Sequence, residues 1–150
     1  MDIFLTIFSG VTVFVAGQVF LKLVIEPVHR FKATVSDISY ALVYYADIYT
    51  NPGVTGEERE TDAKQKLRTL SSELNAATYL IPKYEWARLF FGLPQRDKVV
   101  EAAGILIGLS NSLRDSKFDR GMHNFGRYQK ICTNLNIYLP KGERPDEGTA

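Results

Sequence analysis

The chain opens with an apolar stretch, Ile3–Ile25, that carries only two strongly polar side chains, Gln18 and Lys22. As a helix, these residues would extend for roughly 35 Å, which exceeds the hydrocarbon core of a bilayer, about 30 Å thick. A cleaved secretory signal is the alternative, but it needs a basic start, and the only early charge is Asp2. The pattern therefore predicts one uncleaved transmembrane helix, with residues 1–27 as the anchor.

Basic residues gather at one end of this predicted span. No lysine or arginine precedes Ile3, whereas Lys22, Arg30 and Lys32 lie at or just beyond the other end. Lysine and arginine near a span favour the cytoplasmic side. We therefore expect a single-pass protein of the cell membrane, with its N-terminus outside and its C-terminal domain in the cytoplasm.

Beyond Pro27, which should bend or end the first helix, apolar residues recur at helical spacing. A second helix should begin near Val28 and end at the Thr-Asn-Pro-Gly turn of residues 50–53. Its apolar stripe consists of Phe31, Val35, Ile38, Leu42, Tyr45 and Tyr49.

A third helix is marked at both of its ends. Thr55 and Glu58 have the spacing of a capping box, and Pro82 should stop the helix after about Leu80. The acidic residues of the first turn favour the positive end of the helix dipole, and we interpret them in this way rather than as a metal site. The heptad stripe of this helix consists of Ala63, Leu67, Leu70, Leu74, Ala77 and Ile81.

Two further helices are expected, from Gln95 to about Leu113 and from about Asn124 to Leu135. In the first of them, Gly104 and Gly108 form a GxxxG pattern that should let another helix approach closely. The core-facing positions of the two helices are Val99, Ala103, Leu106, Leu113, Tyr128, Ile131, Cys132 and Leu135.

Because no stretch alternates like a strand, the predicted fold class is all-α. We expect a cytoplasmic bundle of about four principal helices over residues 28–139, antiparallel to their neighbours. Residues 140–150 are polar and rich in proline and glycine, which predicts a disordered tail.

The segment Lys83–Pro94, with the sequence KYEWARLFFGLP, has two interpretations. Aromatic residues such as Trp86, Phe90 and Phe91 beside basic residues are typical of a helix lying in the headgroup zone of a membrane. The simpler interpretation is a helical turn that closes the end of the bundle.

Composition and motifs give little sign of catalysis. The net charge of +1 does not favour a nucleic-acid partner, and the single cysteine, Cys132, fits a small core residue better than a nucleophile. The two histidines, His29 and His123, lack further ligands at zinc spacing, and no phosphate-binding glycine loop is present. We therefore expect no cofactor, no metal and no enzymatic activity.

A basic segment before and within the last helix supplies candidate contacts for an anion or a lipid headgroup. A solvated basic loop is the simpler interpretation. A helical nuclease or hydrolase that uses Arg120 and His123 for acid–base chemistry is an alternative. The candidate residues are Arg114, Lys117, Arg120, His123, Arg127 and Lys130.

Within the span, Gln18 and Lys22 are four residues apart, and Gly10 and Gly17 are seven apart, so each pair shares a helix face. A glutamine inside a span gains from bonding to another helix, and glycines allow close contact. We therefore expect a membrane-anchored interaction or regulatory module that acts through a protein partner or as a homo-oligomer. The alternatives are a lone anchor that tolerates the glutamine, and an oligomeric effector that perturbs the membrane.

Overall fold

A computed structural model of the chain describes residues 2–113, 120–140 and 143, and within these ranges it contains helices and no strand. The predicted all-α class is therefore confirmed for this part of the chain. In chain order the elements are α1 (Asp2–Phe20), a π-helical turn η1 (Leu21–Ile25), α2 (Glu26–Tyr44), α3 (Ala46–Thr50), α4 (Glu57–Leu80), α5 (Tyr84–Phe91), α6 (Arg96–Ser112) and α7 (Arg120–Asn134).

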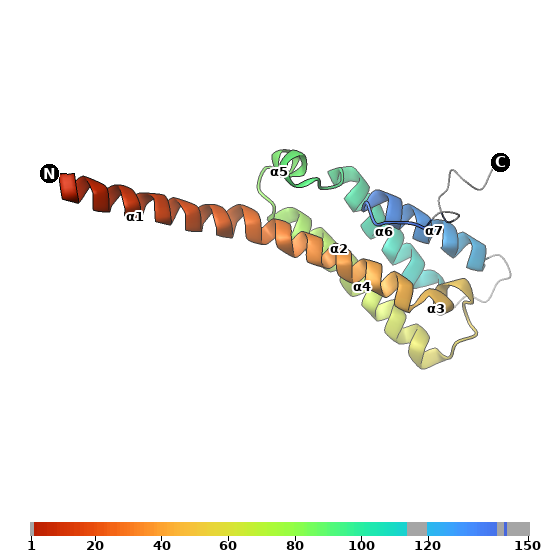
Figure 1. Ribbon diagram of the computed structural model, residues 1–150. Coiled ribbons are helices and arrows are strands. Elements are labelled where there is room, and N and C mark those ends of the chain that lie inside the picture. The colour runs from red at the N-terminus through yellow and green to blue at the C-terminus, as the bar shows by residue number, and fades with distance from the viewer. Residues whose placement is uncertain (1, 114–119, 141–142, 144–150) are drawn as a thin grey trace.

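α1, η1 and α2 form one continuous helix, which projects far beyond the other helices (Figure 1). The predicted break at Pro27 is wrong. The backbone N–H of Glu26 bonds to the carbonyl of Leu21, five residues earlier, so the turn before the proline is widened. This π-turn displaces the carbonyl that the ring of Pro27 would meet in a regular α-helix, and the helix continues.

One helix in the described ranges, Ile3–Tyr44, is long and apolar enough to cross a membrane. None of its most apolar stretch is buried against the other described residues. Length and composition alone are also compatible with a signal sequence or with the core helix of a soluble protein.

The C-terminal half of this long helix belongs to a shared hydrophobic core. α4 packs between α2 and α6, and α7 packs against α6 (Figure 1). Each predicted stripe faces inward, because every member is buried except Val35 and Tyr128, which are partly buried. Cys132 is buried as expected.

The ends of the helices differ in detail from the predictions. The second predicted helix is interrupted at Tyr45, whose hydroxyl donates a hydrogen bond to Asp62 Oδ2 at 2.7 Å. Burial, followed by this carboxylate, raises the pKa of Tyr45 to about 12. The bond ties the end of α2 to the start of α4, and the tyrosine keeps its proton at neutral pH.

The predicted capping box at Thr55 and Glu58 is also wrong. α4 begins one residue later, because Gly56 adopts a φ of 99° and becomes the N-cap. The Thr55 hydroxyl is buried and has no hydrogen-bond partner among the described residues. The positive φ is accessible to glycine at little cost, so the turn at residue 56 determines where the helix begins.

The two glycines of α6 do not act as a seam between helices. A Cβ at Gly104 would meet nothing within 4 Å, and a Cβ at Gly108 would meet the guanidinium of Arg127 at 3.8 Å. The predicted close approach of another helix is therefore wrong at these positions. Of the predicted tail, only Pro140 and Glu143 lie in the described part, and Glu143 accepts a hydrogen bond from the Tyr128 hydroxyl at 3.1 Å.

Replacing Leu70 by alanine should lower the free energy of unfolding by about 2 to 5 kcal/mol, because the side chain is fully buried and its removal leaves a cavity. Leu89→Ala is the matched control, since Leu89 is exposed and its truncation should cost less than about 0.5 kcal/mol. Urea unfolding of a fragment of residues 26–150, followed by circular dichroism, measures both changes. Equal effects of the two substitutions would contradict the described core.

Candidate functional site

The end of the helical domain from which α1 departs carries α5, a short amphipathic helix (Figure 1). Its inner face is fixed to the domain, because Tyr84 and Ala87 are buried and the Tyr84 hydroxyl donates to the carbonyl of Pro94 at 3.0 Å. Burial raises the pKa of Tyr84 to about 12, so the hydroxyl stays protonated as a donor. Two left-handed residues, Lys83 and Gly92, bound the helix.

The outer face of α5 is apolar and exposed. Trp86, Leu89 and Phe90 all point away from the core, and none is covered by another described element. Between α5 and the end of α1 lies an open hollow of about 490 Å³. Its lining includes Phe20 and Val24 of the long helix, and Pro82, Trp86, Phe90 and Phe91 of the α5 region.

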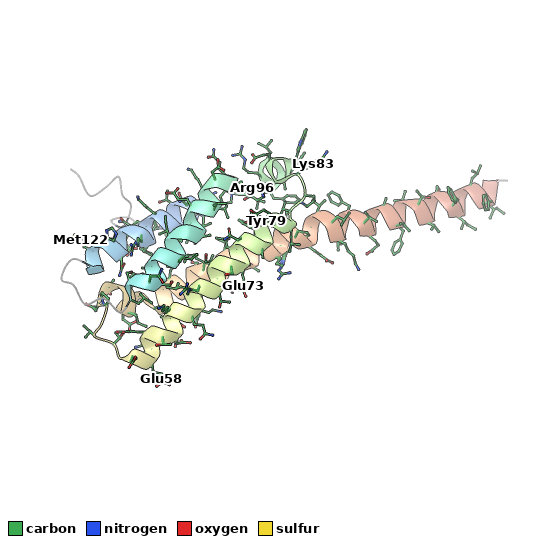
Figure 2. All side chains as sticks on the ribbon, turned by 180° about the vertical axis from the view of Figure 1, so that it is seen from behind. Glu58, Glu73, Tyr79, Lys83, Arg96 and Met122 are labelled. Carbon is green, nitrogen blue, oxygen red and sulfur yellow. The ribbon has the colours of Figure 1, made fainter. Side chains whose placement is uncertain are left out.

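Basic residues surround this end of the domain. Figure 2 shows Lys83, Tyr79 and Arg96 at the end next to the long helix, whereas Glu58 and Met122 lie at the opposite end. The guanidinium of Arg96 lies 5.1 Å from the ring centroid of Tyr79, within the range of a cation–π contact. Arg88 forms an ion pair with Glu85 at 3.1 Å.

The structure thus combines the two interpretations of residues 83–94. The inner face of α5 closes the end of the domain, as the simpler interpretation requires. The outer face remains an exposed apolar and aromatic surface with basic residues beside it, which is the composition of an interfacial helix.

The four residues singled out in the predicted span are all exposed in the part of the chain that the structure describes. A Cβ added at Gly10 or Gly17 would meet nothing within 4 Å. These positions are therefore open to contact with another molecule.

An exposed face of the long helix extends from α1 onto the domain. Glu26, Ala33 and Tyr40 follow at seven-residue intervals, and Tyr44 follows one turn later. Gln18 precedes Glu26 by eight residues, but η1 accommodates one extra residue, so Gln18 lies on the same face. Figure 1 shows the helix continuing through this junction without a break. The tyrosine rings at its far end stack on each other with centroids 5.6 Å apart.

The predicted basic segment is only partly brought together. Arg114 and Lys117 lie outside the described residues, and Arg120 begins α7 with its side chain undescribed. His123, Arg127 and Lys130 line an open hollow of about 390 Å³ together with Met122 and Gly126.

Arg127 has a structural role in this hollow. Its guanidinium donates to the Gly108 carbonyl at 3.2 Å and to Asn124 Oδ1 at 3.1 Å. The bond to Gly108 holds α7 against α6, and the two bonds together engage one guanidinium nitrogen that an anion could otherwise contact.

Asn124 is a connecting residue that the sequence analysis did not single out. It is fully buried, its Nδ2 donates to the Tyr49 carbonyl at 3.0 Å, and its Oδ1 accepts from the Ser112 hydroxyl at 2.6 Å. One side chain therefore joins α7 to α3 and α6. Its place four residues before Tyr128, in line with the core stripe of α7, is the sequence signal that could have identified it.

The described residues offer little support for a metal site or for Cys132 as a nucleophile. No group of three histidine, cysteine or acidic side chains there could hold a metal ion. Burial raises the pKa of Cys132 to about 12, so at neutral pH the thiol is protonated and a poor nucleophile.

Comparison with known proteins gives no family: no family model matches the chain, and neither a curated protein nor a solved structure matches it.

Replacing Gly121 by alanine should destabilise the protein by about 1 to 3 kcal/mol, because the added Cβ would overlap the backbone carbonyl of Thr50 and force α7 away from α3. Gly126→Ala, in the same helix, is the matched control. A Cβ there meets nothing within 4 Å, so helix propensity should make this change stabilising by about 0.5 to 1 kcal/mol. Thermal or urea unfolding that gave both variants the same sign would contradict the described contact.

Proposed function

We propose that this protein is a membrane-anchored helical module that acts at the cytoplasmic face by binding another helical protein or a second copy of itself. The observation that carries this proposal is the continuous helix Ile3–Tyr44. Its first half is apolar and exposed on every side, while one face of its second half is part of the domain core.

Each half of this helix supports a different part of the proposal. An apolar helix with no buried surface is stable in a lipid environment, where its backbone is satisfied internally. The second half, with α4, α6 and α7, forms the antiparallel bundle of about four helices that this proposal places in the cytoplasm. Lys22, Arg30 and Lys32 at the junction favour that side of the membrane.

The binding surface in this proposal is the exposed face that contains Gln18, Tyr40 and Tyr44. Gln18 is exposed among the described residues, and an amide in lipid gains from bonding across a helix pair. Stacked, exposed tyrosines are typical of recognition surfaces, because they supply large contact areas with few rotatable bonds. A partner helix that lies alongside the long helix would cover both ends of this face.

The topology can be tested with tags at both ends of the chain. In intact cells or spheroplasts, added protease should remove an N-terminal tag and spare a C-terminal one, because the domain is enclosed by the membrane. After permeabilisation the C-terminal tag should be digested as well. Digestion of the C-terminal tag in sealed cells would contradict the proposed orientation.

Association through the span can be tested with Gln18→Leu, which should lower the crosslinked or partner-bound fraction in native membranes several-fold. The expected loss is about 0.6 to 2 kcal/mol, the range of one hydrogen bond between helices in lipid. Gly17→Ile should lower the fraction further by keeping the backbones apart.

Ala16→Ile is the control for this experiment, since it adds the same side chain one residue away on another part of the helix surface. Membrane insertion, measured by resistance to alkaline extraction, should stay intact in all variants. An unchanged crosslinked fraction in Gln18→Leu and Gly17→Ile would show that the span only anchors the protein.

A further inference from the structure

We propose that α5 is a second membrane contact, lying in the cytoplasmic leaflet of the bilayer that α1 crosses, with its outer face at the boundary between headgroups and acyl chains. This inference rests on the proposed function, because it requires α1 to span the membrane. Its ligand is the lipid of that leaflet.

The apolar face of α5 is large and cannot turn inward. Trp86, Leu89 and Phe90 are 65%, 73% and 79% exposed, which is unusual for three large apolar side chains on one short helix. The opposite side of the helix is fixed by the burial of Tyr84 and Ala87. The face is thus presented outward by the fold itself.

The position of α5 along the long helix matches the edge of a bilayer. Val24 contributes to the hollow beside α5 and lies about 32 Å along the helix from Ile3, close to the thickness of a hydrocarbon core, about 30 Å. A bilayer that covered α1 would therefore end at the level of α5. The hollow between Phe20, Val24 and Phe90 would then open toward acyl chains and exclude water.

The residues beside this face suit the headgroup zone. A tryptophan in α5, and lysines at positions 22 and 83, are of the types that concentrate at membrane interfaces. The arginine of α5 is paired with Glu85, so the helix presents no unpaired carboxylate next to its apolar face. The aromatic rings would bury apolar area in the membrane interface, and the lysines can contact lipid phosphates.

Lipid is favoured over a protein occupant because the surface is continuous with the span. The hollow is lined by α1 and η1 as well as by α5, so a protein that covered it would also have to cover Phe20 and Val24 at the end of the span. A bilayer around α1 reaches these residues without any further contact.

The single tryptophan of the chain, Trp86, reports directly on this face. The full-length protein should be reconstituted in phosphatidylcholine vesicles that contain lipids brominated either near the glycerol or deep in the acyl chain. Trp86 fluorescence should be quenched by bromine, more strongly by the shallow position, and should be poorly accessible to acrylamide in the aqueous phase.

Two variants and a control test the cause of the quenching. Phe90→Glu and, separately, Leu89→Glu place a charge on the apolar face at exposed positions, so the fold should persist by circular dichroism while lipid quenching is lost and acrylamide quenching rises several-fold. Met122→Glu makes the same change at an exposed helical position at the opposite end of the domain (Figure 2) and should leave both signals unchanged.

The outcomes separate this inference from the proposed function, since alkaline extraction of the same vesicles reports insertion of α1. If the protein is inserted but Trp86 is quenched by acrylamide and not by bromolipid, the proposed contact of α5 is wrong, whereas α1 is still a membrane anchor. Inserted protein with Trp86 shielded from both quenchers shows that a second copy covers the face, which also overturns the inference. Protein released by alkali overturns the anchor and the α5 contact together.

Discussion

The hydrogen bond from the Glu26 N–H to the Leu21 carbonyl is the interaction on which the arrangement depends. It closes a π-turn just before Pro27 and lets the helix pass a residue that would otherwise break it. Without it, the ring of Pro27 would meet a carbonyl of the preceding turn, and the helix would kink or break there. With it, the exposed apolar segment and one face of the domain core belong to one continuous helix, and this fixes the position of α5 relative to α1.

The periodic positions of the sequence predicted the helical elements well, because burial of an apolar face is what holds each of them. The stripe from Ala63 to Ile81 is buried throughout, and the ends of α4 and α6 lie within a residue or two of the predicted ones. Periodicity is a property of the whole helix, so single residues change it little.

Local signals were less reliable. Pro27 and the pair Thr55 and Glu58 were interpreted from residue type, but an adjacent π-turn and the positive φ of Gly56 decided the outcome. The candidate site was also predicted in part: the aromatic residues of α5 were identified, whereas its orientation depends on Tyr84 reaching Pro94. Asn124 was missed because its three partners come from α3, α6 and α7, which sequence spacing alone does not bring together.

The extra residue in η1 also determines how far α1 is rotated about the helix axis relative to α2. Compared with regular α-helical geometry through the same residues, the π-turn rotates everything before it by about 100° relative to the domain, with a shift of about 1.5 Å along the axis. In regular α-helical geometry Gln18 would lie off the face that carries Tyr40 and Tyr44, although each residue would keep its local surroundings. The π-turn therefore sets the angle between the side chains of α1 and those of the domain, independently of any contact between the two.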